Sequence, residues 1–245
     1  MGNDIPSEAM QQLAPTGKLR VAINFGNSVL AQKDPVTGAA GGITPELARE
    51  LGRRLHKDVE LVTFDAAGKV FEALASGAWD VAFLAIDPLR AASIEFTAPY
   101  VIIEGSYMVR VDSPLKTIDD VDRPGVRIAV ASGSAYDLHL TRTLAHAQLL
   151  RSATGNEALE AFLRDDIEVA AGVKSPLQKF AATRSQLRVM DGRFMAIEQA
   201  MGVPSGRLAA RNYLSGFVEE MKASGFVAQA LQRSGQHDAL VAPPA

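Results

Sequence analysis

Strand-like apolar runs alternate with helix-like patterns in two successive cycles, and this repeated alternation limits the fold more than any other feature of the chain. The runs of strand length lie at 19–23, 59–64 and 81–86 in the first half and at 127–131, 149–150 and 167–173 in the second. Between them, apolar residues recur at helical spacing. Two βαβαβ blocks predict an α/β protein of two lobes, each a mostly parallel sheet flanked by helices.

Local signals place several ends of these elements. Thr44 followed by Pro45 predicts a helix with threonine as its N-cap and proline at its first position. Gly77 is expected to end a later helix. Residues 81–86 are apolar on both faces, which predicts a fully buried strand. The period of the apolar residues over 207–233 predicts a helical C-terminal segment.

Composition excludes several classes of function. The net charge is -3 and no basic block occurs, so we expect no nucleic-acid partner. The chain has no cysteine, which excludes disulfides, thiolate zinc sites and cysteine nucleophiles. Its four histidines are scattered, and no phosphate-binding glycine motif is present, so we expect neither a metal nor a cofactor. Residues 1–17 lack the apolar segment of a signal peptide.

Six short motifs, taken in order, resemble the family 3 extracellular solute-binding proteins, whose type II periplasmic fold is best known for binding polar amino acids. The motifs are Gly-Gly-Ile-Thr-Pro-Glu-Leu-Ala (41–48), Ser-Gly-Ala-Trp-Asp-Val (76–81), Asp-Pro-Leu-Arg (87–90), Phe-Thr-Ala-Pro-Tyr (96–100), Ala-Ser-Gly-Ser (131–134) and Ala-Ser-Gly (223–225). The resemblance runs from about Leu19 to Gly235. No single motif is specific, whereas their order and spacing are.

The resemblance implies a two-lobed, periplasmic-binding-protein-like type II fold. Lobe 1 is expected to be discontinuous, with residues 1–102 plus 199–245, and lobe 2 to be inserted at 103–198, with two hinge crossovers between them. It further implies a solute-binding component of an ABC importer, whose partners are a small-molecule ligand and a membrane permease. We expect a monomer in the periplasm, with a signal peptide already removed.

Arg90 is the first candidate for ligand binding. It follows a buried strand, where the family places an arginine that holds a ligand carboxylate, and a guanidinium matches a carboxylate with two parallel hydrogen bonds. Asp87 would orient Arg90; alternatively, the two residues pair only to fix their loop. Ala85 occupies a position at which the family usually has a serine or threonine that helps hold the carboxylate.

The turn at Gly133 supplies the second group of candidates. Ser134 is expected to cap a helix, with Asp137 three residues later as in a capping box. The N–H groups of Ser134, Ala135 and Tyr136 would face the cleft between the lobes and bind an anionic group. The Tyr136 ring either covers the ligand or packs in the core.

Two further pairs complete the candidate site. Asn24 and Asn27 follow the first strand, where they would contact a polar neutral group or simply form a turn with Gly26. Amino-acid binders of the family have an aspartate for the ligand ammonium at the position of Val173, which Lys174 follows. Because that carboxylate is absent, we expect a carboxylate or another small anion without an amine, with Lys174 as a second anchor or as a solvated helix start.

Two other functions use the same fold. One is an enzyme resembling cyclohexadienyl dehydratase, which requires an acid or base with a tuned pKa; Asp87 and Glu104 are the nearest carboxylates. The other is the ligand-sensing domain of a receptor. Neither a catalytic motif nor a signalling helix is evident in the sequence, so we expect a binding protein without catalysis.

Overall fold

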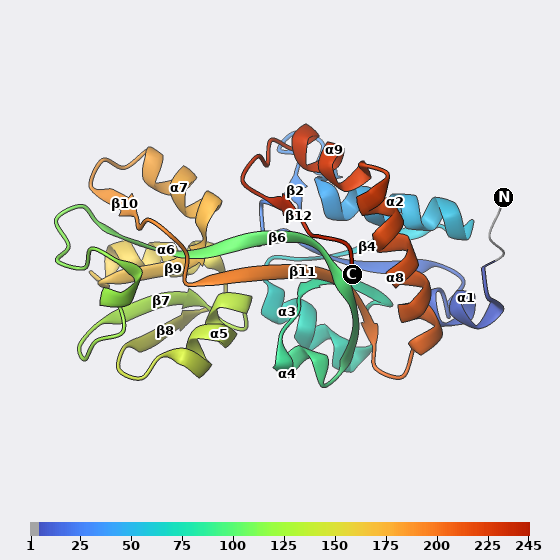
Figure 1. The fold of residues 1–245 in the computed structure, drawn as a ribbon, viewed down its shortest axis with the longest axis horizontal. Coiled ribbons are helices and arrows are strands. Elements are labelled where there is room, and N and C mark those ends of the chain that lie inside the picture. The colour runs from blue at the N-terminus through green and yellow to red at the C-terminus, as the bar shows by residue number, and fades with distance from the viewer. Residues whose placement is uncertain (1–4) are drawn as a thin grey trace. The chain divides into compact units, whose positions relative to one another are not determined.

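The computed structural model describes residues 5–245 and confirms the predicted α/β class (Figure 1). These residues form two compact units: unit 1 runs up to Ile102 and resumes at Glu198, and unit 2 is Ile103–Ile197. Two long strands, β6 (Ile94–Arg110) and β11 (Met195–Pro204), contribute to both units.

The remaining elements divide between the units. Unit 1 contains α1 (Ser7–Leu13), β1 (Leu19–Asn24), β2 (Gln32–Lys33), β3 (Ala40–Gly41), α2 (Ile43–Leu55), β4 (Val59–Phe64), α3 (Ala67–Glu72), a 3-10 turn (Ala73–Ser76), β5 (Val81–Ala85), α4 (Pro88–Ala91), α8 (Leu208–Ala223), α9 (Phe226–Arg233) and β12 (Leu240–Val241). Unit 2 contains a 3-10 turn (Ile118–Asp120), β7 (Arg127–Ala131), α5 (Ala135–Thr143), β8 (Gln148–Ser152), α6 (Gly155–Arg164), β9 (Val169–Val173), α7 (Lys174–Ala182) and β10 (Leu187–Val189).

The sheet of unit 1 has the order β4-β1-β5-β11-β6. β1 pairs in parallel with β4 and β5, whereas β11 returns from unit 2 and pairs antiparallel with β5. Helices cover both faces, with α2 on one side of β1 and β4 and α3 on the other (Figure 1). Trp79 is buried in the core beneath α3 and donates a hydrogen bond from Nε1 to the Val70 carbonyl at 2.9 Å.

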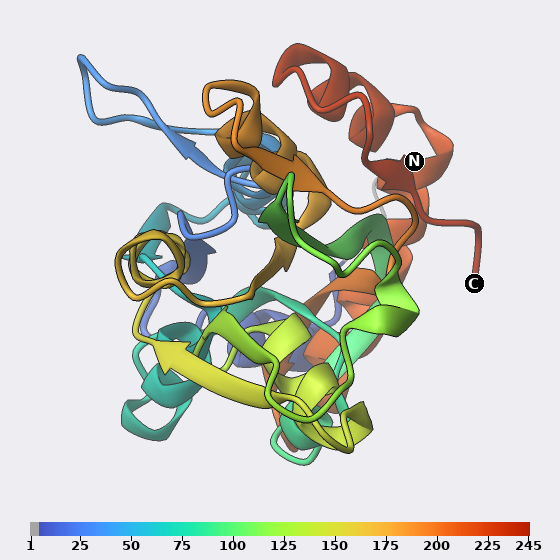
Figure 2. The same cartoon turned by 90° about the vertical axis from the view of Figure 1, so that its left-hand side faces the viewer.

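The sheet of unit 2 has the order β6-β9-β7-β8, and its side chains alternate between two cores. Ile128 and Val130 pack into the core that includes Leu140 of α5, whereas Ala129 packs into the core that includes Phe162 of α6. Because successive strand residues point to opposite faces, a sheet covered on both sides needs an apolar run such as 127–131. Figure 2 shows these helices around the strands of unit 2.

Of the predictions about helices, one was wrong and one was confirmed. Thr44 is not an N-cap: α2 begins at Ile43 after Gly42, whose φ of 97° suits glycine, and Thr44 donates its N–H and hydroxyl to the Leu30 carbonyl. The C-terminal segment is helical as predicted, and Gly225, with φ of 79°, divides it into α8 and α9.

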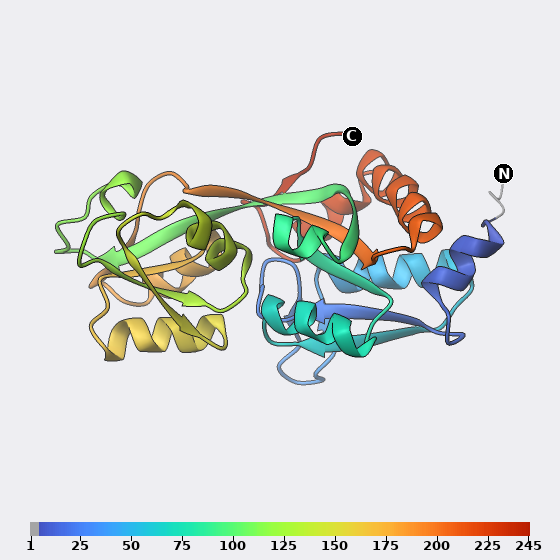
Figure 3. The ribbon, with the colours of Figure 1, turned by 90° about the horizontal axis from the view of Figure 1, so that it is seen from below.

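A buried carboxylate joins distant parts of unit 1. Asp80 has no exposed side-chain surface and accepts hydrogen bonds from Arg20 Nε and Nη2 at 2.8 and 2.9 Å. Arg207, just before α8, donates Nη1 to Asp80 at 3.1 Å and to the Gln12 carbonyl of α1 at 2.8 Å. Figure 3 shows α1 beside α8, which come from opposite ends of the chain. Asp80 therefore joins the N-terminal and C-terminal segments of unit 1.

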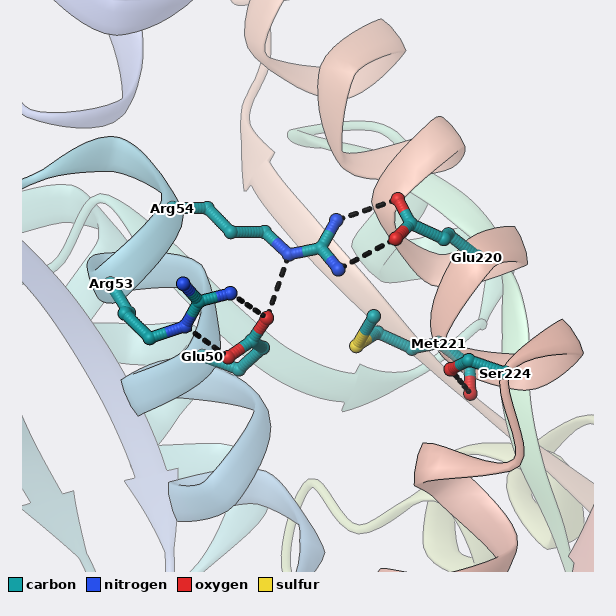
Figure 4. Close-up of polar contacts among 6 residues, drawn as sticks. All are labelled: Glu50, Arg53, Arg54, Glu220, Met221 and Ser224. Carbon is teal, nitrogen blue, oxygen red and sulfur yellow. Dashed lines mark hydrogen bonds and ion pairs between the residues drawn. The ribbon is translucent and has the colours of Figure 1, made fainter. Parts of the chain in front are cut away.

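A second ion-pair network lies between α2 and α8 (Figure 4). Glu50 accepts from Arg53 at 2.8 Å through two nitrogens and from Arg54 Nε at 2.8 Å. Arg54 in turn donates two hydrogen bonds to Glu220, at 2.6 and 2.7 Å. The hydrogen bond from Arg53 is the largest of the effects that lower the pKa of Glu50 to about 2, although partial burial opposes it.

Candidate functional site

The segment after β5 brings Ala85, Asp87 and Arg90 together. Asp87 is the N-cap of α4: its carboxylate accepts the Leu89 N–H at 2.9 Å, and Pro88 takes the first helical position. Arg90 Nη1 donates to the Ala85 carbonyl at 2.9 Å, and only 1% of the Arg90 surface is exposed. Burial lowers the pKa of the Arg90 guanidinium to about 10, and the negative charge of Asp87 opposes this shift.

The asparagines after β1 form local turns. Asn24 Oδ1 accepts the Gly26 N–H at 2.9 Å, and Asn27 Oδ1 accepts the Val29 N–H at 3.3 Å. These bonds use the carbonyl oxygen of each side chain. Asn24 is the last residue of β1 and Asn27 lies three positions beyond it, and both form the turns that the alternative interpretation expects.

The capping arrangement at the start of α5 differs in one bond from a capping box. Ser134 Oγ accepts the Asp137 N–H at 3.1 Å, as predicted for an N-cap. The Asp137 carboxylate, however, accepts the Gly133 N–H at 2.8 Å, because the Ser134 N–H already donates to the Ala131 carbonyl. Asp137 also accepts from Arg151 at 2.9 Å. The aspartate therefore fixes the turn and is neutralised by its own arginine.

Ala135 and Tyr136 lie in the first turn of α5, whose N–H groups have no acceptor within the helix. The Tyr136 ring is partly buried and packs against the core of unit 2 that contains Leu140. Desolvation raises the pKa of the Tyr136 hydroxyl. These contacts agree with the packing interpretation of Tyr136, while its role toward a ligand stays a prediction.

Val173 ends β9, and Lys174 begins α7. Lys174 is not a freely solvated residue: its Nζ lies 2.9 Å from Glu104 Oε2. Arg193 reaches the other oxygen of the same carboxylate, with Nη1 3.1 Å from Glu104 Oε1. The hydrogen bond from Lys174 lowers the pKa of Glu104 most, and Arg193 adds to the shift. Glu104, Lys174 and Arg193 are called the Glu104 triad below.

In each unit the candidate residues lie at the carboxyl ends of neighbouring parallel strands. β1 and β5 are parallel neighbours, with Val21 opposite Val81, so Asn24 and the Ala85–Arg90 segment follow adjacent strand ends. In unit 2, β7 and β9 are parallel neighbours, with Ile128 opposite Val169. Ser134 and Lys174 therefore also follow adjacent strand ends. Ligands of open α/β sheets bind beyond such carboxyl ends.

Sequence reasoning missed one member of the Glu104 triad and misjudged another. Arg193 was not a candidate, because it lies in a short connection between β10 and β11 that carries no motif. Glu104 was considered only as a catalytic carboxylate. No sequence signal indicates the contact, because Glu104 lies beside Lys174 only through the pairing of Gly105 with Val173, which depends on the sheet register.

Neither a metal-binding cluster nor a membrane-spanning helix occurs within residues 5–245. No three acidic or histidine side chains in this part of the chain gather as they would around a metal ion. None of its helices combines the length and the apolar character that crossing a bilayer requires.

Comparison with known proteins relates this chain to binding proteins. The glutamine-binding protein of Geobacillus stearothermophilus is 21% identical over 212 residues, which cover 84% of this chain and 79% of the relative. An amino-acid-binding protein of Dichelobacter nodosus, AabA, is 21% identical over 195 residues, covering 78% and 77%.

Solved structures share the fold. A receptor for L-cysteine from Neisseria gonorrhoeae superposes with a TM-score of 0.80 at 20% identity, covering 92% of each chain. A mutant of ArgBP from T. maritima has a TM-score of 0.79 at 20% identity, covering 94% of this chain and all of the other. The predicted type II periplasmic-binding-protein fold is confirmed by these likenesses.

The family assignment comes from a match over most of the chain. The model for bacterial extracellular solute-binding proteins, family 3, matches residues 28–237. Members of this family bind solutes rather than catalyse reactions, and the relatives named above are binding proteins. The chain belongs to the bacterial extracellular solute-binding proteins of family 3.

Proposed function

We propose that this chain is the solute-binding component of an ABC importer and that its two units are lobes that close on a small, polar, carboxylate-bearing solute. The observation that carries the proposal is the family match over residues 28–237. We propose further that the protein works as a monomer in the periplasm and passes its solute to a membrane permease.

Arg90 supports a carboxylate as the bound group. A guanidinium that is buried with Asp87 nearby is costly to desolvate, and a ligand carboxylate would offset that cost with charge-assisted hydrogen bonds. Ala135 and Tyr136 of α5 would add first-turn N–H groups, whereas the Ser134 N–H is taken by the Ala131 carbonyl. Asn24 and Asn27 would contact the polar remainder of the solute.

The relatives are named for amino acids, including glutamine and L-cysteine, which favours an amino acid as the solute. The apolar Val173 favours a solute without an ammonium group, because the strand end offers no carboxylate of its own. Both classes therefore belong in the first screen, which would compare amino acids, dicarboxylates, keto acids and amines by thermal unfolding. A solute present at about 100 times its Kd stabilises the protein by about 2.7 kcal/mol.

Substitution of Arg90 tests the site directly. We expect Arg90→Ala to abolish the thermal shift given by the best carboxylate of the screen. Arg90→Lys keeps a positive charge and most of the buried stem but loses the two-pronged geometry, and we expect it to lose most of the shift. Arg49→Lys, at an exposed arginine of α2, is the matched control and should keep the full shift.

The folding of each variant would be checked by circular dichroism before the screen. A full shift in the folded Arg90→Lys and Arg90→Ala variants would show that Arg90 does not hold the solute. No shift of the wild-type protein with any solute of the four classes would contradict the proposed function itself.

A further inference from the structure

The Glu104 triad carries more positive charge than its own carboxylate neutralises. One carboxylate faces two cations, so the three side chains sum to a charge of about +1 at neutral pH. The side chains are partly open to solvent: 32% of Glu104, 27% of Lys174 and 48% of Arg193 is exposed. The triad is therefore accessible as well as charged.

The two cations retain hydrogen-bonding capacity. An ammonium has three donors and a guanidinium five, whereas Glu104 takes one hydrogen bond from each. Within residues 5–245, Glu104 is the only hydrogen-bonding or ion-pair partner found for Lys174 and for Arg193. An acceptor from outside the chain could satisfy the remaining donors without breaking either ion pair.

The backbone holds the triad in place. Phe194, next to Arg193, donates its N–H to the Gly105 carbonyl at 3.0 Å and stacks on Tyr107 at 4.4 Å between ring centroids. A Cβ at Gly105 would lie 2.9 Å from Met195 Cγ and 3.1 Å from the Phe194 ring, so a larger residue would have to displace these side chains. Arg193 and Glu104 are thus presented by neighbouring, packed backbone segments, and not by a free loop.

The triad lies at the carboxyl ends of the parallel strands of unit 2, where α/β proteins bind their ligands. Lys174 follows the carboxyl end of β9, the parallel neighbour of β7, which leads to Ser134 and the first turn of α5. Both positively polarised groups of unit 2, the triad and the α5 N-terminus, therefore follow adjacent strand ends at the same sheet edge.

We propose that Lys174 and Arg193 form an anion clamp that selects acidic solutes, and that Glu104 positions both cations. This inference rests on the proposed function and narrows its substrate class: the preferred solute carries a carboxylate in addition to the one assigned to Arg90. An amide in place of that second carboxylate would leave the clamp without a charge partner, and an approaching ammonium would meet net positive charge.

Two acid–amide pairs test the clamp by calorimetry at low ionic strength: succinate against succinamate, and L-glutamate against L-glutamine. Each pair differs by one charge at nearly constant shape, with and without an α-ammonium group. We expect the acid of at least one pair to bind about tenfold or more tightly than its amide, as the loss of a charged hydrogen bond implies.

Substitutions of the cations and of the carboxylate of the triad should change the affinity for the acid in opposite directions. Lys174→Met and Arg193→Met should each weaken binding of the acid about tenfold and reduce its advantage over the amide. Glu104→Gln keeps the shape and an acceptor oxygen for the cations but removes the negative charge beside the solute, and it should strengthen binding of the acid. A purely structural ion-pair triad would give the same sign for all three. Lys179→Met, at an exposed lysine of the same helix α7, is the matched control and should change nothing.

The outcomes separate this inference from the proposed function. Binding of some screened solute, with neither acid preferred over its amide, overturns the clamp and leaves the solute-binding proposal intact. Weaker acid binding in Glu104→Gln as well as in Lys174→Met also overturns it. If the wild-type protein binds no solute at all, both proposals fail.

Discussion

Asp80 in unit 1 and Glu104 in unit 2 are each held by two cations, but in opposite surroundings. Asp80 has no exposed side-chain surface, and Arg20 and Arg207 surround it. Glu104 is 32% exposed. Where water is excluded, removing one partner leaves an uncompensated charge, whereas water replaces a partner lost near the surface. A carboxylate with two cations therefore stabilises the fold in unit 1, whereas in unit 2 the same kind of group leaves hydrogen-bond donors accessible to a ligand.

Glu50 provides an intermediate case within unit 1. It also faces two arginines, Arg53 and Arg54, and 17% of its side chain is exposed. If burial decides how much such an ion-pair group stabilises the fold, replacing its carboxylate should lower the free energy of unfolding most at Asp80, less at Glu50 and least at Glu104. The three predictions below follow that order.

The largest effect is expected at Asp80. Asp80→Asn leaves Arg20 and Arg207 without their common partner and should lower the free energy of unfolding of unit 1 by about 3–5 kcal/mol. The chain has one tryptophan, Trp79, which is fully buried in unit 1, so its fluorescence during urea unfolding reports on this unit. Asp65→Asn, at an exposed ion pair with Lys69, is the control and should cost less than about 1 kcal/mol. Equal costs at Asp80 and Asp65 would break the comparison.

A smaller, pH-dependent effect is expected at Glu50. Its pKa of about 2 in the folded protein lies below the value of 4.5 expected when the chain is unfolded. The ionised form is thus favoured by folding, and its contribution is fully present above about pH 4.5 and is lost as the pH falls toward 2. Wild type and Glu50→Gln should differ in unfolding free energy at pH 6 and converge near pH 2. A difference that stays constant over this range would contradict the assignment.

The smallest effect on stability is expected at Glu104. Glu104→Gln should change the free energy of unfolding of unit 2 by no more than about 1 kcal/mol, because the triad is partly solvated. Circular dichroism during urea unfolding measures it, with Glu160→Gln on the exposed side of α6 as control. A loss as large as that at Asp80 would assign Glu104 a structural role and remove the distinction between the two units.

The strands were largely predictable from the sequence, and the long-range partners were not. The runs at 81–86 and 127–131 match β5 and β7 closely, because a strand buried between helices must be apolar on both faces. Thr44 misled, because the helix begins one residue before it, at Ile43, and the Thr44 hydroxyl donates to the Leu30 carbonyl, 14 positions away. Local pattern defines an element but does not reveal which distant group competes for its side chains.

The same limit applies to the candidate site. The Ser134 cap and the Asp87–Arg90 turn depend on neighbours within five residues, and both are present in the structure. Arg193 approaches Glu104 from 89 positions away. Such a contact depends on strand register and on the Phe194 stack, which no local spacing encodes. Whether these residues hold a solute stays a prediction for the substitutions proposed above.

The return of β11 and Arg207 to unit 1 has a consequence for synthesis on the ribosome. Unit 2 is one uninterrupted stretch and can fold as soon as it emerges. Unit 1 must wait, because its strand β5 lacks its antiparallel neighbour, and Asp80 its second arginine, until the whole of unit 2 has been translated. The completion of unit 1 therefore depends on residues from both sides of unit 2, and one edge of β5 stays unpaired until β11 is in place.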